Sequence, residues 1–227
     1  MKRGARRLAA ELLIVIFGVL IALSVDAARQ GFGQRRLERQ VLQALRDEFE
    51  ANRRLLDEQL SAYRRRTAAA EVLLALGSGV AAIQPDSLGV LWARVTRAGT
   101  YDPSQGVLAA AISTGNIGLI RDLQLRAALA QWPSDLEDLR YAEELVADLI
   151  YGHLMPWART QADFPNGGFG LGAGPMSSAA WAPALSHRTM QNLLREEIAW
   201  GRIIEGARVS ETIDSIVTRI DAQIDSQ

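Results

Sequence analysis

A long apolar stretch lies close to the N-terminus. Residues 8–26 contain only two charged side chains, Glu11 and Asp26, and the segment 12–23 contains none. A helix needs about 20 residues to cross the hydrocarbon core of a bilayer. A soluble helix would show a polar face, and this segment shows none. The pattern predicts a transmembrane helix over residues 8–26, preceded by a basic tail over residues 1–7.

The predicted span also carries a pair of small residues of the kind that lets two membrane helices pack closely. Gly18 and Ala22 are four positions apart and so share one face of the helix, which is a weak form of the GxxxG contact. We expect this face to be a candidate helix-dimer interface. The residues predicted to lie within the bilayer are Leu12, Ile14, Phe17, Gly18, Leu20, Ala22 and Leu23.

Basic residues flank the predicted span on both sides. The cluster before it is the tighter one and includes the free amine, so the positive-inside rule favours a cytoplasmic N-terminus and an extracytoplasmic C-terminal part. A cleaved signal peptide is the alternative, because Val25-Asp26-Ala27 is an acceptable cleavage site, although Glu11 within the apolar segment argues against it. The flanking residues are Lys2, Arg3, Arg6 and Arg7 before the span, and Arg29, Arg35, Arg36 and Arg39 after it.

The pattern then changes to that of a long amphipathic helix. Residues 34–76 contain no proline or glycine, and apolar or small residues recur at steps of three and four, which places them on one helix face. Gly31 and Gly33 predict a flexible joint between this helix and the membrane. The predicted stripe is Leu37, Val41, Leu45, Phe49, Asn52, Leu56, Leu60, Tyr63, Thr67, Ala70 and Leu74. The predicted surface ion pairs are Glu50 with Arg54, Arg53 with Asp57, and Arg54 with Glu58.

Shorter helices are predicted for the rest of the chain, because Gly, Pro and capping residues divide it into periodic segments. No segment alternates like a strand beyond four residues. The predicted fold is therefore all-α, with a single N-terminal transmembrane helix followed by a long amphipathic helix and a helical bundle, which together form a domain over residues 27–227. The predicted helices are 88–98, 102–113, 123–132 with Asp122 as N-cap, 134–158, and 186–224 with a bend near Gly201 or Gly206. Pro133 either kinks the helix before it or occupies the first turn of the helix after it.

Residues 161–186 form a long stretch without a helical pattern. They include the run Asn166-Gly167-Gly168-Phe169-Gly170-Leu171-Gly172-Ala173-Gly174-Pro175. Loops of this length are usually functional or mobile. A P-loop is excluded, because that motif needs Gly-Lys-Ser/Thr and Lys2 is the only lysine of the chain. We expect a flexible loop or lid.

The amino-acid composition mainly excludes certain kinds of site and partner. The chain has no cysteine and two histidines, which removes disulfides, thiolate zinc sites and iron–sulfur clusters. A net charge of -1 argues against nucleic acid as a partner. The balance is uneven, since residues 28–66 hold ten basic and six acidic side chains, whereas residues 134–227 hold seven and fourteen. No cofactor is predicted.

Few residues suggest chemistry. His153 and His187 stand at no metal-ligand spacing, and we interpret His153 as packed at a helix end and His187 as exposed. Adjacent residues of a helix point in different directions, so the pairs Glu143-Glu144 and Glu196-Glu197 are interpreted as solvated, with one member of each able to face inward. For Arg64-Arg65-Arg66 a solvated face is favoured over a phosphate clamp. No catalytic or metal-binding residue is predicted.

Two segments of the chain carry a family resemblance. The first has Ala10-Glu11, Gly18, Leu20-Ile21-Ala22-Leu23, Glu48-Phe49 and Asn52. The second has Ser113-Thr114-Gly115-Asn116-Ile117-Gly118-Leu119-Ile120-Arg121-Asp122, Leu125-Arg126 and Leu129. Together they resemble an uncharacterised family of bacterial single-pass membrane proteins, which open with a basic tail, a Gly/Ala-Glu pair and an apolar helix. The resemblance implies an uncleaved anchor in the bacterial inner membrane and brings no known activity.

Two hypotheses for function follow. The first is a membrane-anchored helical interaction or scaffold module that is not an enzyme, whose partners are the lipid bilayer and either another protein or a second copy of the chain. The alternative is an extracytoplasmic sensory bundle that binds a small ligand. It would work through a partner protein, because seven residues before Leu8 are too few for a cytoplasmic output domain.

Overall fold

The structure is a computed structural model that describes residues 2–77, 85–161 and 178–226, with side chains for 33–77, 87–160 and 181–226. Within these ranges it is all-α and contains no strand, as predicted. The elements are α1 (Lys2–Leu76), α2 (Pro85–Val95), α3 (Gly106–Ser113), η2 (Asn116–Leu119), α4 (Leu123–Asp148), η3 (Leu149–Leu154), α5 (Met155–Gln161), α6 (Ser178–Ser186), α7 (Arg188–Glu205) and α8 (Val209–Asp225).

The first helix organises the whole molecule. The predicted stripe along α1 is confirmed, because every stripe residue from Leu45 to Ala70 is buried, whereas Leu37 at its start is 40% exposed. The helix ends at Gly77, whose φ of +44° lies in the left-handed region that glycine adopts most readily. The predicted ion pair of Arg53 with Asp57 is also present, but the other two predicted pairs are not, since Glu50 pairs with Arg46 instead.

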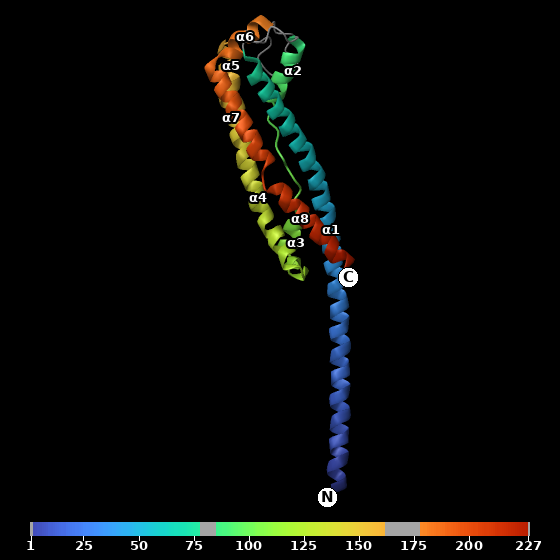
Figure 1. Cartoon of the computed structure of the whole chain (residues 1–227). Helices are drawn as coiled ribbons and strands as arrows, with labels where there is room; N and C mark the ends of the chain where they lie inside the picture. The colour runs from blue at the N-terminus through green and yellow to red at the C-terminus, as the bar shows by residue number, and fades with distance from the viewer. Residues whose placement is uncertain (1, 78–84, 162–177, 227) are drawn as a thin grey trace.

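The predicted flexible joint at Gly31 and Gly33 is wrong. Helix α1 continues through both residues as one helix of 75 residues. Glycine weakens a helix interior by about 1 kcal/mol but does not break it, and no proline or capping signal stands here to end it. The N-terminal half of α1 therefore leaves the bundle as a straight rod (Figure 1).

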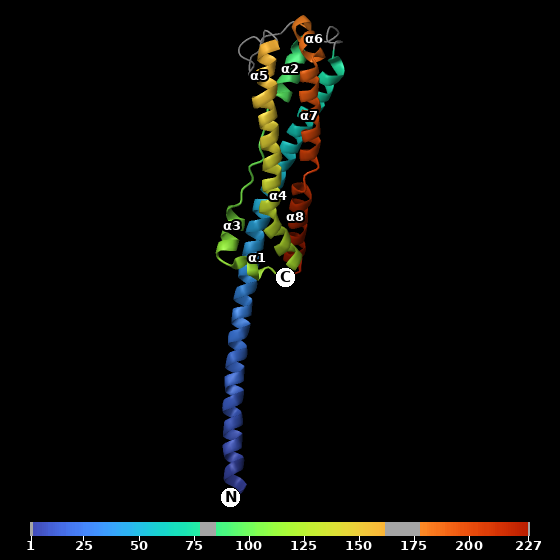
Figure 2. The same cartoon turned by 90° about the vertical axis from the view of Figure 1, so that its left-hand side faces the viewer.

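The bundle is built mainly from the second half of α1, from α4, and from α7 followed by α8. The bundle half of α1 and helix α4 run in the same direction, and α7 and α8 run antiparallel to them. The C-terminus therefore lies where α1 enters the bundle (Figures 1 and 2). Two contacts between α8 and α1 fix that end. Gln223 donates a hydrogen bond to Glu38 at 2.6 Å, and Arg46 pairs with Asp221 at 2.6 Å. The largest buried side chains include Trp132, Trp181, Tyr63 and Phe49.

An extended connector, residues 96–105, joins α2 to α3 along the side of α1. Asn52 holds it by donating to the carbonyl of Ser104 at 2.7 Å and accepting from the Ser104 amide at 2.9 Å. The carboxylate of Glu48 accepts from the amides of Val107 and Leu108 at 2.9 and 3.0 Å. Glu48 thus satisfies the free N–H groups at the start of α3, which begins at Gly106 rather than at the predicted Asp102.

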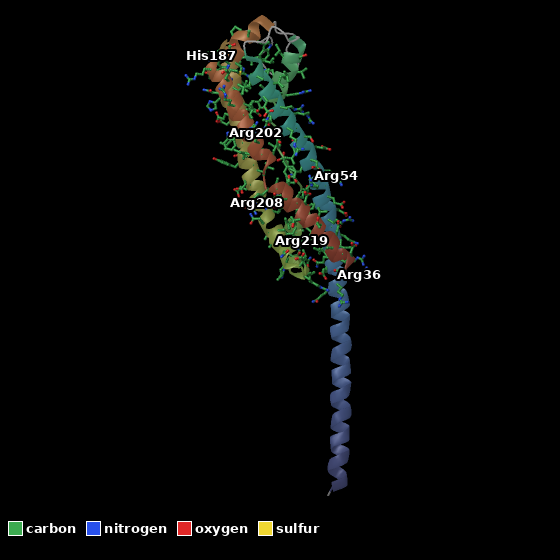
Figure 3. The ribbon with its side chains drawn as sticks, in the orientation of Figure 1. Arg36, Arg54, His187, Arg202, Arg208 and Arg219 are labelled. Carbon is green, nitrogen blue, oxygen red and sulfur yellow. The ribbon has the colours of Figure 1, made fainter. Side chains whose placement is uncertain are left out.

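Helix boundaries elsewhere follow the sequence signals in part. Asp122 caps α4 as predicted, accepting from the amides of Gln124 and Leu125, and Arg219 of α8 (labelled in Figure 3) bonds its second oxygen at 3.0 Å. Pro133 lies inside α4 without dividing it, so the two helices predicted there are one. The single helix predicted over 186–224 is two helices, because α7 ends at Glu205 with Gly206 as its C-cap and α8 begins at Val209, so the chain breaks at one of the two positions where a bend was expected.

The prediction of a loop over 161–186 is partly wrong. Residues 178–186 form helix α6, while residues 162–177, which include the glycine run, lie outside the described residues. The expectation of a lid therefore stays a prediction. Helices α5 and α6 lie at the end of the bundle opposite the N-terminal rod (Figure 1).

In the part of the chain that the structure describes, no helix combines the length and the apolar character that crossing a membrane requires. The side chains of the predicted span over residues 8–26 lie outside the described residues. The predicted span and its dimer face at Gly18 and Ala22 therefore stay predictions. The same holds for the other predicted bilayer residues, Leu12, Ile14, Phe17, Leu20 and Leu23.

A close approach of α7 to α1 at Gly201 yields a first prediction. A Cβ atom at Gly201 would overlap Oγ1 of Thr67 and lie 3.2 Å from its Cβ. Gly201→Ala should therefore lower the free energy of unfolding by about 1–3 kcal/mol, and adding Thr67→Ala should restore part of the loss. Chemical denaturation measures both. Gly89→Ala, where nothing lies within 4 Å of the added atom, is the control and should not destabilise. Equal stabilities for the two alanine variants would contradict the tight contact.

Candidate functional site

A basic cleft lies between α1 and the C-terminal end of α2. Its volume is about 420 Å³, which falls within the range of small-molecule sites, ~300–1,000 Å³. Helix α2 lies beside the distal half of α1, far from the N-terminal rod (Figure 1). The lining residues are Glu58, Gln59, Ala62, Tyr63, Arg65, Arg66, Arg94, Arg97, Ala98 and Gly99.

Helical geometry explains why these residues meet. Positions 58, 62, 65 and 66 of α1 follow steps of three and four, so their side chains share one face. The other wall comes from Arg94 in the last turn of α2 and from Arg97 just after it. Cationic side chains near a helix C-terminus interact favourably with the helix dipole, which supports both arginines at this end of α2.

The rim of the cleft is positively charged. Arg65, Arg94 and Arg97 are exposed, and none forms an ion pair with a carboxylate that the structure describes. Glu58 is the acidic residue of the lining, so three exposed guanidinium groups face one carboxylate. The neighbouring Arg64 differs, because it points away and pairs with Glu205 at 3.7 Å. The rim thus carries an excess of two positive charges.

The buried members of the lining, Arg66 and Tyr63, form the floor of the cleft. Nε of Arg66 donates to Glu197 of α7 at 2.6 Å, and both side chains are almost completely buried. Nη2 of Arg66 and the second carboxylate oxygen of Glu197 have no hydrogen-bond partner. Burial raises the pKa of Glu197, and the positive charge of Arg66 opposes that rise. The guanidinium also lies over the Tyr63 ring, 5.2 Å from its centroid.

A second buried carboxylate, Glu143 of α4, secures the floor from below. It accepts hydrogen bonds from the Tyr63 hydroxyl and from the amide of Tyr101, the latter at 3.0 Å. Burial raises the pKa of Glu143, and burial together with this carboxylate raises the pKa of Tyr63. The Tyr63 hydroxyl also lies 3.4 Å from the Gly99 carbonyl in the cleft wall. Three elements are thus joined through one tyrosine.

The structure separates the members of each clustered motif in the sequence. Glu143 and Glu197 are buried, while Glu144 and Glu196 are exposed. The interpretation of both acidic pairs as solvated is therefore wrong for one member of each. The arginine run 64–66 divides in the same way, into one arginine paired at the surface, one on the cleft rim and one in its floor.

The two histidines lie away from the cleft. His153 is exposed in the π-helical turn η3, 3.5 Å from Asp148, so the prediction that it packs at a helix end is wrong. His187 is exposed as predicted and is itself the N-cap of α7, where Nδ1 accepts from the Thr189 amide at 3.2 Å. Among the described residues no group of three His, Asp or Glu side chains is placed to hold a metal ion.

Sequence reasoning missed Arg94 and Arg97 as site residues. They are separated from Arg65 and Arg66 by about 30 positions, and only the packing of α2 on α1 brings the four together. The sequence did contain one signal for this site, because Arg94 and Arg97 both lie near the end of the helix predicted over residues 88–98. The chemistry of the arrangement is ionic binding, because guanidinium groups recognise oxyanions through paired hydrogen bonds.

Comparison with known proteins adds no relative: no family model, no characterised protein and no solved structure matches the chain. The class of the protein is therefore defined by its architecture, a helical bundle on one long projecting helix with a basic cleft in its distal half.

The buried ion pair gives a second prediction. Arg66→Met leaves the Glu197 carboxylate buried without its partner and should lower the free energy of unfolding by about 3–5 kcal/mol. The double variant Arg66→Met/Glu197→Met should recover most of this loss, because no charge then remains buried. Arg64→Met is the matched surface control and should change stability by about 1 kcal/mol or less. An equal loss of unfolding free energy in Arg66→Met and Arg64→Met would show that the buried ion pair matters no more to stability than a surface pair.

The raised pKa of Glu143 gives a third prediction. The folded chain keeps a proton on this carboxyl above its ordinary pKa of 4.5, where the unfolded chain has lost it. This group therefore makes the free energy of unfolding fall as pH rises from 4.5 through the raised pKa. In Glu143→Gln that fall is absent, so the stability of the variant relative to the wild type should increase with pH across the window.

Urea denaturation at a series of pH values from 4 to 8 measures the difference. Glu144→Gln, a change at the exposed neighbour, is the control and should give a difference that does not vary with pH. A Glu143→Gln profile parallel to that of the wild type would refute the assignment.

Proposed function

We propose that this chain is a membrane-anchored helical interaction module, in which α1 serves both as the anchor and as a rigid spacer. The observation that carries the proposal is the continuity of α1. The apolar segment 8–26 lies on the same helix as the buried stripe, and Glu38 is the first buried residue among those of α1 whose side chains the structure describes. Residues 27–37 then leave about 16 Å of helix between the bilayer and the bundle.

The apolar content of the segment and the resemblance to bacterial single-pass membrane proteins support the same proposal. An N-terminal basic tail favours a bundle on the extracytoplasmic side of the inner membrane. The proposed partners are the bilayer and either another protein or a second copy of the chain through Gly18 and Ala22. The module is proposed to be non-catalytic, because its buried carboxylates and tyrosine serve as packing partners of one another.

A second candidate function is the ligand-binding bundle, which would work through a partner protein. The cleft favours it, because three exposed arginines without an ion pair to a described carboxylate line it above a buried, ordered guanidinium. Both candidate functions include the membrane anchor. They differ in whether the bundle binds another protein or a small ligand.

The anchor generates a fourth prediction. The full chain should stay with membranes through an alkaline carbonate wash, with an intact mass that includes residue 1, and external protease should degrade the bundle in spheroplasts. Ile16→Arg/Leu20→Arg should release it, because each arginine at mid-span costs about 3 kcal/mol on insertion scales.

Leu37→Arg changes an exposed position of the same helix beyond the apolar segment and should leave the chain bound. A mass beginning near residue 27 would establish the cleaved-signal alternative. Full protection of the bundle from protease would overturn the proposed orientation.

A further inference from the structure

We propose that the basic cleft binds a small soluble molecule with two or more negative charges on oxyanion groups, such as a phosphate ester or a polycarboxylate. The inference deepens the ligand-binding candidate above, and its exclusion of lipid as the ligand rests on the proposed anchor. Three features of the cleft carry it, namely its charge, its buried floor and its position along α1.

The cleft carries an excess of positive charge that a bound anion would neutralise. Arg65, Arg94 and Arg97 converge on one opening, and the excess of two positive charges over Glu58 matches a dianion. Other arginines of the bundle meet carboxylates from α8, as Arg46 does, or stand alone on an exposed face, as Arg54 does. The cleft differs because three exposed arginines without an ion pair to a described carboxylate line one opening. A bound oxyanion would relieve the mutual repulsion of the three guanidinium groups.

The floor supplies a polar group that is already ordered. Arg66 is 97% buried, its Nε is fixed on Glu197, and its Nη2 has no partner. Nη2 of Arg66 and the unpaired oxygen of Glu197 are both buried from solvent, so they belong to the interior of the ion pair. Arg66 therefore contributes an ordered positive charge beneath the rim. The Tyr63 ring beneath the guanidinium and the Glu143 hydrogen bond beneath Tyr63 hold the floor in place.

The size of the cleft selects a small molecule. A volume of about 420 Å³ suits a compound of metabolite size. One face of α1 and the end of one short helix form its walls, so the basic surface stays confined. An extended nucleic-acid strand needs a longer positively charged groove.

The position of the cleft separates it from lipid headgroups. Arg65 lies on the same unbroken helix as the proposed span, about 58 Å beyond Asp26 at ~1.5 Å per residue. The headgroup layer extends only about 5–8 Å beyond the hydrocarbon core. Phospholipid phosphates of the anchoring membrane therefore cannot reach the cleft, and the oxyanion must come from solution.

The fifth prediction tests the cleft with the full chain in an uncharged detergent. Pyrophosphate and citrate, titrated calorimetrically at 50 and 300 mM NaCl, separate phosphate from carboxylate chemistry. At least one should bind saturably, more weakly at the higher salt concentration. Arg94→Ala/Arg97→Ala should weaken binding at least tenfold. Arg36→Ala/Arg54→Ala is the control with equal loss of charge, because both arginines are exposed on α1 outside the cleft (Figure 3), and it should change affinity less than twofold.

Several results would overturn the proposal. They are no binding of either probe at 10 mM, equal weakening in both double variants, or an equally arginine-dependent and tighter binding of single-stranded DNA. Nanodiscs with and without phosphatidylglycerol test the source of the anion, and loss of probe binding in the anionic discs would assign the cleft to lipid. Because binding is measured in detergent, a chain that fails the carbonate-wash test but binds the probe retains the ligand site and loses only the anchor.

Discussion

The buried stripe of α1 is the constraint on which the rest of the structure depends. Helices α2, α3, α6, α7 and α8 all contact this one helix, and most of them are too short to be stable alone. They are therefore ordered by docking on a preformed surface. The stripe is not purely apolar, because Asn52, Tyr63 and Thr67 lie within it. Each of these positions determines where a particular neighbour packs.

Buried polar groups give the bundle its register. Glu48 and Asn52 position the connector and the start of α3, Glu143 joins the connector to α1 through Tyr63, and the ion pair of Arg66 with Glu197 fixes α7. Such groups are costly to bury, so their partners must arrive in a defined geometry, which an apolar contact does not require. The same groups form the floor of the cleft. An ordered floor below a rim of exposed arginines is a suitable arrangement for recognising an anion, because the floor loses little freedom on binding.

The geometry of α1 connects the two proposals for function. A flexible joint would let the bundle move relative to the N-terminal segment, whereas one unbroken helix sets a fixed distance between the proposed span and the cleft. If the proposed anchor holds, the packing of α2, α3, α6, α7 and α8 on the bundle half of α1 places the cleft far from lipid. A second copy that paired through the N-terminal rod would hold two clefts at the same height, and the protein would then present them to a partner in a defined orientation.

The sequence by itself determined the all-α class, the stripe of α1, the Asp122 cap and the break at Gly206, because each depends on residues within a few positions of one another. It also showed that three arginines and two pairs of glutamates are consecutive in the chain. It did not determine which member of each cluster would be buried, the continuation of α1 through Gly31 and Gly33, or the meeting of Arg94 and Arg97 with Arg65. The choice of the buried member and the meeting of the arginines depend on contacts between segments 30 to 130 positions apart, such as Arg66 with Glu197. The continuation through Gly31 and Gly33 is local, because glycine costs a helix too little to end it where no proline or cap stands. Helical periodicity specifies a face, but only the packed neighbour decides whether that face meets water, a counter-charge or an open cleft.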